Sequence, residues 1–89
     1  MCGDFMKIIR ISAIWCTSCI LTTKDFNQIK EKYKDIEYVE LDYDTDDLEE
    51  YNVGDTLPVI IVYKDNEEIT RIIGEKRFKE IDKVLKELI

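Results

Sequence analysis

A Cys-x-x-Cys pair stands where the pattern of apolar residues changes from that of a strand to that of a helix. Residues 5–14 (FMKIIRISAI) are mainly apolar and rich in β-branched Ile, broken by Lys7, Arg10 and Ser12, which predicts a largely buried strand. From Cys16 to about Lys34 apolar residues recur at roughly helical spacing, which predicts a helix beginning at the pair. Cys16 and Cys19 are therefore expected in the first turn of a helix that directly follows a buried strand. The fold must bring these two elements together at the pair.

The remaining chain predicts a mixed sheet with helices around it. The expected elements are a strand over 36–43, a short helix over 45–53 capped by Thr45 or Asp46, a strand over 57–63, a strand over 68–74 and an amphipathic helix over 78–88. The order βαβαββα makes the first two strands parallel, and the turn sequence KDNEE makes the last two an antiparallel hairpin. We therefore expect an α/β fold with a four-stranded mixed sheet flanked by three helices. Residues 1–89 are expected to form one domain.

Charge and hydropathy lower the odds of several function classes. The chain carries a net charge of -7, and residues 37–50 contain acids but no Lys or Arg. Such a surface repels nucleic-acid phosphates and anionic lipids, so no nucleic acid or membrane partner is expected. No apolar run approaches the roughly 20 residues needed to span a bilayer, and the first residues do not read as a secretory signal. A cytoplasmic location is therefore expected. Structural disulfides are rare in that compartment, so a close cysteine pair there is expected to serve catalysis or metal binding.

The position of the pair favours thiol chemistry. A thiol in the first helical turn lies against unpaired backbone N–H groups and the positive end of the helix macrodipole, both of which stabilise a thiolate. Cys19 follows Cys16 by one turn, so it can displace a substrate held on Cys16 as a mixed disulfide. We predict Cys16 as the nucleophile and Cys19 as the resolving thiol. Thr17 and Ser18 between them can hydrogen-bond a thiolate or serve as exposed loop residues.

Metal binding is the alternative from a different class of function. A zinc site needs three or four ligands, yet the chain has no His and only one other thiol, Cys2. A metal or cluster site would need Cys2 with a carboxylate, or a pair from each of two chains. A structural disulfide across so small a loop would gain little chain entropy. Cys2 itself is expected to be an ordinary free cysteine, with an intermolecular disulfide or glutathionylation as the alternative.

Three segments resemble the thioredoxin superfamily, and the resemblance runs from Lys7 to Ile89. They are Trp15-Cys16-Thr17-Ser18-Cys19, Thr56-Leu57-Pro58 before the third strand, and Gly74 after the fourth. The resemblance implies a thioredoxin-like fold, a cis bond before Pro58, and a thiol-disulfide oxidoreductase that reduces protein disulfides. It implies disulfide-containing substrate proteins as partners, a thioredoxin reductase or equivalent electron donor, no cofactor and no metal, and a monomer.

Departures from the family pattern leave a second activity open. Only fifteen residues precede Cys16, so the leading strand and helix of full thioredoxins are expected to be missing, and the size is closer to glutaredoxins. The central dipeptide is Thr17-Ser18, where thioredoxins have Gly-Pro and many glutaredoxins Pro-Tyr. Thr56-Leu57-Pro58 is similar to the glutaredoxin segment that contacts glutathione, but the glutaredoxin Gly-Gly-x-x-Asp signature is absent. A glutathione-dependent, glutaredoxin-like activity is therefore the alternative.

The resemblance also implies a substrate surface. Trp15 would lie beside the cysteines as a flat apolar contact for substrate. Pro58 and the backbone of Leu57 would face the cysteines, and an extended substrate could hydrogen-bond to Leu57. An apolar floor would come from residues that can equally be plain core. These are Ile14, Ile20 and Val59.

Arg10 stands six residues before Cys16, where thioredoxins usually have a buried acid paired with a lysine on the neighbouring strand. The matching position on that strand is Glu40, so the polarity of the pair is exchanged. If Arg10 and Glu40 share a face of the sheet, they can pair, as a buried guanidinium requires. The alternative is that Arg10 keeps its charged end in water. In the paired case Arg10 would stabilise a thiolate at Cys19, and Glu40 could accept its proton through water.

Overall fold

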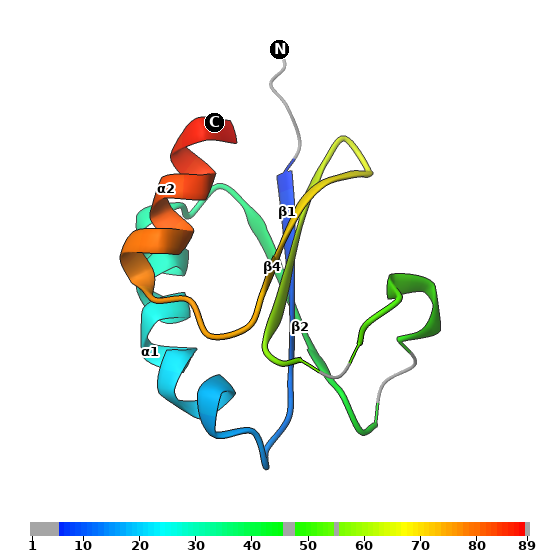
Figure 1. Cartoon of the computed structure of the whole chain (residues 1–89). Helices are drawn as coiled ribbons and strands as arrows, with labels where there is room; N and C mark the ends of the chain where they lie inside the picture. The colour runs from blue at the N-terminus through cyan, green and yellow to red at the C-terminus, as the bar shows by residue number, and fades with distance from the viewer. Residues whose placement is uncertain (1–5, 46–47, 55, 89) are drawn as a thin grey trace.

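The computed structural model describes residues 6–45, 48–54 and 56–88, so Cys2 and the expected cap Asp46 lie outside the described residues. In chain order the elements are β1 (Met6–Ser12), α1 (Thr17–Lys32), β2 (Glu37–Asp42), the 3₁₀ helix η1 (Glu49–Tyr51), β3 (Val59–Lys64), β4 (Glu67–Ile73) and α2 (Phe78–Leu88) (Figure 1). The four strands and the two long helices agree with the predicted order. No helix in these ranges is long and apolar enough to cross a membrane.

The sheet has the predicted mixed topology. Its strand order is β2-β1-β3-β4, with β1 and β2 parallel, and with β3 antiparallel to both β1 and β4. The carboxyl ends of β1 and β2 and the start of β3 therefore meet at one end of the sheet. This end, at the bottom of Figure 1, is also where α1 begins.

Both faces of the sheet are covered, which explains why β1 and β3 are apolar on both sides. Figure 1 shows α1 and α2 together on one face and the segment carrying η1 on the other. The core on the helix side contains Met6, Ile8, Phe26, Ile29, Ile36, Ile60, Val62, Ile72, Ile81 and Leu85. The core on the opposite side contains Ile9, Ile11, Ala13, Cys16, Cys19, Leu57, Val59 and Ile61. The cysteine pair thus belongs to the second core.

The prediction of a third α-helix over 45–53 is wrong. In its place is η1, a single 3₁₀ turn whose first residue follows Leu48 without a side-chain cap. Asn52 ends it in the left-handed conformation (φ 51°), which Asn adopts more readily than most residues and which stops helix propagation. The acidic pattern that suggested a helix is real, but one turn is too short to gain the cooperativity of an α-helix.

Asp25 joins α1 to the start of α2. This buried side chain accepts a hydrogen bond from the backbone N–H of Phe78 at 3.1 Å and from Nε of Arg77 at 2.9 Å. It therefore satisfies one of the unpaired N–H groups at the N-terminus of α2, although it lies on another helix.

Replacing Asp25 by alanine should lower the free energy of unfolding by about 1–3 kcal/mol, because the partly buried N–H of Phe78 loses its acceptor. Thermal or urea unfolding monitored by circular dichroism measures this change. The matched control is Arg77→Ala, which removes only the partly exposed ion pair and should cost less than about 1 kcal/mol. Equal losses in the two variants would contradict the capping role.

Candidate active site

Cys16 is the N-cap residue of α1. Its backbone is extended (φ -87°, ψ 110°), and its Sγ accepts a hydrogen bond from the backbone N–H of Cys19 at 3.2 Å. Its own N–H donates to the carbonyl of Ala13 at 3.1 Å, which fixes the sharp connection from β1. The sulfur thus lies at the positive end of the helix macrodipole, where negative charge is stabilised. The strand–helix boundary predicted at the pair is confirmed.

Cys19 lies one turn further along and is the more deeply buried of the two thiols, with 2% of its surface exposed against 8% for Cys16. Both are free thiols. Burial raises the pKa of Cys19 to about 11, and its hydrogen bond with the side chain of Cys16 acts in the same direction. The positive charge of Arg10 lowers this pKa and so partly opposes burial. Cys19 is therefore a protonated, shielded thiol at neutral pH.

The Leu57–Pro58 peptide bond is cis, as the resemblance implied. Leu57 is buried in the same core as Cys16 and Cys19, whereas Thr56 is exposed. The carbonyl of Pro58 accepts a hydrogen bond from the N–H of Gly74 at 2.9 Å. Gly74 has a φ of 90°, a backbone conformation that residues with a Cβ atom rarely adopt. Glycine is therefore required where β4 ends beside this loop.

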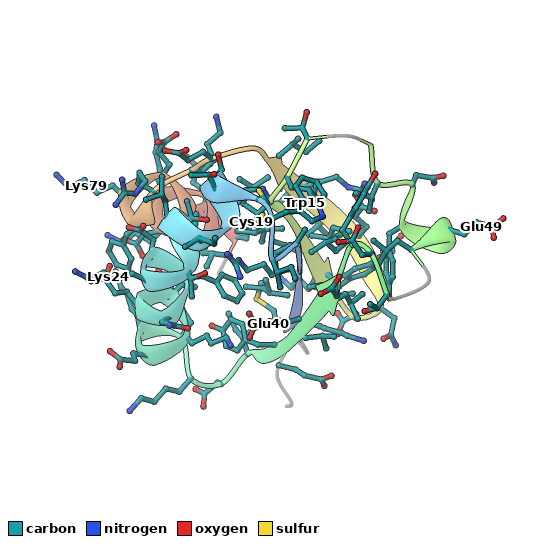
Figure 2. The ribbon with its side chains drawn as sticks, turned by 90° about the horizontal axis from the view of Figure 1, so that it is seen from below. Trp15, Cys19, Lys24, Glu40, Glu49 and Lys79 are labelled. Carbon is teal, nitrogen blue, oxygen red and sulfur yellow. The ribbon has the colours of Figure 1, made fainter. Side chains whose placement is uncertain are left out.

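Apolar side chains are exposed around the pair. Trp15 is 59% exposed, and its indole N–H donates to Asp44 Oδ2 at 2.6 Å while its ring meets Tyr43 edge-on. Figure 2 shows Trp15 and Cys19 at the end of the molecule that faces the viewer. Of the three residues expected as an apolar floor, Ile14 and Ile20 are 84% and 62% exposed and belong to this surface. Val59 is buried core instead.

Arg10 is buried, with only 3% of its surface exposed, so the alternative that its charged end reaches water is wrong. It lies on the helix-facing side of β1, and its guanidinium carbon is 5.3 Å from the ring centroid of Phe26. Nη2 donates to the backbone carbonyl of Cys19 at 2.7 Å and to Thr23 Oγ1 at 3.3 Å. A positive charge is thereby fixed to the first turn of α1, directly at the resolving cysteine.

Glu40 pairs with Arg10, which decides between the two alternatives that the sequence left open. The two residues are in register on β1 and β2, and Arg10 Nη1 lies 3.4 Å from Glu40 Oε1. The other carboxylate oxygen, Oε2, is 2.7 Å from Nζ of Lys30. Lys30 and, more weakly, Arg10 lower the pKa of Glu40. Figure 2 places Glu40 on β2, away from Trp15.

Sequence reasoning missed three side chains at this end of the molecule. Thr23 reinforces the Arg10 contact by donating from Oγ1 to the carbonyl of Cys19 at 2.8 Å. Asp44 holds Trp15, and Asp42 lines a cavity beside Cys19. The signal for both acids was available, because β2 is parallel to β1 and its carboxyl end must lie beside the cysteines.

Metal ligands do not gather anywhere in the described residues, where no group of three or more His, Cys, Asp or Glu side chains could hold an ion. The pair therefore lacks further ligands from the described part of its own chain. A site shared between two chains would still require both pairs to meet.

A family model and two curated relatives all identify this chain as similar to thioredoxins. A family model described as Thioredoxin matches residues 4–87. Thioredoxin H2 of Arabidopsis thaliana is 32% identical over 85 residues, covering 93% of this chain and 62% of that protein. Thioredoxin H5 of Oryza sativa subsp. japonica is 38% identical over 69 residues, covering 75% of this chain and 50% of that protein. The chain thus spans 62% and 50% of the lengths of these two relatives.

A solved structure shares the fold. A chain in the crystal structure of the complex of ferredoxin:thioredoxin reductase and thioredoxin f2 superimposes with a TM-score of 0.85 at 20% identity, covering 97% of this chain and 79% of that one. The family match extends over nearly all of the sequence, and the superposition covers the same elements that position Cys16, Cys19 and the cis Pro58. The chain belongs to the thioredoxin family.

Proposed function

We propose that the protein is a thiol-disulfide oxidoreductase that reduces disulfides in other proteins. One observation carries this proposal. Cys16, the less buried thiol, caps the N-terminus of α1 one turn before Cys19, a buried thiol whose pKa is raised to about 11. The two cysteines therefore differ in the way that their two roles require. The family match supports the same activity.

The reaction has two steps. The Cys16 thiolate attacks one sulfur of a substrate disulfide, forms a mixed disulfide with it and releases the other sulfur as a thiolate. Cys19 then loses its proton and attacks Cys16 Sγ, which forms the Cys16–Cys19 disulfide and releases the second substrate sulfur. The substrate gains two electrons and the protein loses two. A reductant must afterwards return the pair to the dithiol.

Substrate is proposed to bind across the exposed apolar side chains around Cys16. Ile14, Trp15 and Ile20 offer contact area, and the backbone of Leu57 before the cis Pro58 offers hydrogen bonds to an extended segment. An open surface of this kind can bind an extended segment of a substrate protein, which a deep pocket could not accommodate. Disulfides in flexible or partly unfolded segments are therefore the proposed substrates. We further propose that the chain acts as a monomer in the cytoplasm, where the dithiol form is maintained.

The proposed electron donor is a thioredoxin reductase or its equivalent. The solved complex named above contains a thioredoxin beside a reductase, which supports a reductase as the class of partner. The alternative donor is glutathione, favoured by the Thr56-Leu57-Pro58 segment. The test compares the two in one assay: precipitation of reduced insulin chains, driven by a thioredoxin reductase with its nicotinamide donor or by glutathione with its own reductase. The proposed function would be overturned if the protein reduced no insulin with either donor or with dithiothreitol.

A zinc determination on protein purified without chelator separates this function from metal binding. If the protein is an oxidoreductase, the purified sample should contain far less than one zinc ion per two chains. Stoichiometric metal lost on alkylating Cys16 and Cys19 would instead support the site shared by two chains.

Arg10 is proposed as a residue that tunes Cys19. Replacing Arg10 by methionine removes the nearby positive charge, so the pKa of Cys19 should rise further and its attack on a mixed disulfide should slow several-fold. The first attack, by Cys16, should change little. The free energy of unfolding should also change little. Glu40 retains its ion pair with Lys30, and the carbonyl of Cys19 retains its hydrogen bond from Thr23. The variant also removes Arg10 Nε, which is buried without a hydrogen-bond partner among the described residues.

Stopped-flow release of thionitrobenzoate from Ellman's reagent measures the two attacks separately, since only the first depends on reagent concentration. The matched control is Lys7→Met, which removes a cation from the opposite face of β1. An unchanged rate of the second release in Arg10→Met would show that Arg10 is only a structural residue.

A further inference from the structure

A small cavity lies beside the resolving cysteine. It has a volume of about 210 Å³, which has room for a few water molecules at about 30 Å³ each. Cys19 forms part of its wall, and its polar lining comes from Ser12, Thr23 and Asp42. Among the side chains that line it, only Cys19 and Asp42 carry an acidic group, a thiol and a carboxyl.

Asp42 is held in place at this cavity by the fold. It is the last residue of β2 and pairs in register with Ser12 at the end of β1. Its Oδ1 accepts a hydrogen bond from the backbone N–H of Asp44 at 2.8 Å, which fixes the orientation of the carboxylate. The parallel pairing of β1 and β2 thus places a carboxylate and the resolving thiol at the same cavity, which has room for water.

Cys19 needs a proton acceptor because it is protonated until it attacks. Its pKa is raised to about 11 by burial, so a negligible fraction is thiolate at neutral pH. Arg10 can stabilise the thiolate but cannot accept a proton, since a guanidinium stays protonated. Glu40 does not line the cavity, and its two oxygens face Arg10 and Lys30. Thr23 Oγ1 is already committed to the carbonyl of Cys19.

We propose that Asp42 accepts the proton of Cys19 through water in this cavity when Cys19 resolves the mixed disulfide. The inference rests on the proposed function and names a further residue for its second step. The Cys19 S–H proton passes to water and from there to the Asp42 carboxylate, while the sulfur attacks Cys16 Sγ. The Cys16–Cys19 bond forms, the bond from Cys16 to the substrate sulfur breaks, and the substrate leaves as a thiolate that later takes up a proton. This role replaces the one considered above for Glu40.

The test uses Asp42→Asn in a Cys2→Ser background, so that only the active-site thiols react with Ellman's reagent. Asparagine keeps an oxygen for the N–H of Asp44 but cannot take up a proton. We expect the second, concentration-independent release of thionitrobenzoate to slow by at least about tenfold, because general bases contribute about 10²–10⁴-fold. The first release should stay within about twofold of the parent rate. The matched control is Glu37→Gln, an exposed carboxylate at the other end of β2, which should change neither rate.

Two further measurements separate proton transfer from a structural effect. Formate or acetate added to Asp42→Asn should restore part of the second rate, whereas chloride at equal ionic strength should not. Asp42→Glu should resolve faster than Asp42→Asn. An unchanged second rate in Asp42→Asn, or a loss of both rates that formate does not rescue, would overturn the role of Asp42. Failure of the proposed function would look different, because the parent protein would then show no second release at all.

Discussion

Replacing Cys19 by serine is expected to stop turnover and leave substrate covalently attached to Cys16. The first attack needs only Cys16, whose sulfur keeps its hydrogen bond to the backbone N–H of residue 19. The mixed disulfide then has no intramolecular thiol to break it, and release must wait for a thiol from solution. Because a neighbouring group acts at a far higher effective concentration than a dissolved one, insulin reduction should fall by at least about 100-fold.

Mass spectrometry of the protein after incubation with a disulfide substrate should find the adduct on Cys16. The matched control is Cys16→Ser, which should neither reduce insulin nor form an adduct at Cys19, since that thiol is buried and protonated. Adducts that accumulate on Cys19 in the Cys16→Ser protein would reverse the two assignments.

Iodoacetamide at pH 7 is expected to label Cys16 and to leave Cys19 almost untouched in the reduced protein. Alkylation requires the thiolate, and with a pKa of about 11 only about one Cys19 in 10,000 is ionised at pH 7. An ordinary cysteine is ionised to about 3% at this pH, so the smaller ionised fraction alone should make Cys19 react about 300-fold more slowly. Its burial slows the reaction further.

The labelling rate of Cys19 should depend on pH in the direction that its raised pKa requires. A raised pKa means that the folded protein holds the Cys19 proton above the pH at which a free thiol loses it, so the labelling rate at Cys19 should keep rising up to about pH 11. Peptide mapping after timed labelling at several pH values measures both rates. A Cys19 rate that levels off near pH 8 would contradict the raised pKa.

The sequence predicted the sheet and the cysteine geometry because their signals are local. Apolar runs mark β1 and β3, alternation of apolar and polar residues marks β2, and a change of period at Cys16 marks the start of α1. The short helix over 45–53 was mispredicted because acidic residues at suitable spacing cannot reveal that Asn52 would end η1 after one turn. Tertiary geometry decided that segment, while its composition did not.

The surroundings of Cys19 depend on contacts between distant segments. Strand alternation allowed Arg10 and Glu40 to pair but could not decide it, because the pairing depends on the register of β1 and β2. The hydrogen bond from Arg10 to the carbonyl of Cys19 depends in turn on how α1 crosses the sheet. The cavity with Asp42 likewise requires the register of β2 against β1. Ile14 and Ile20 were ambiguous between core and surface because one apolar residue looks like another until the burial of its face is known.

Equilibration with glutathione redox buffers, followed by Trp15 fluorescence, tests most directly whether Cys16 and Cys19 act as one dithiol that reduces disulfides. Trp15 is adjacent to Cys16 and half exposed, so oxidation of the pair should change its emission. We expect one two-electron transition with a midpoint near the reducing end of the family range, about -270 mV, and a Cys16–Cys19 disulfide in the oxidised protein. A midpoint near -120 mV, about that of a strong oxidant, or an oxidised form without that disulfide would contradict this expectation.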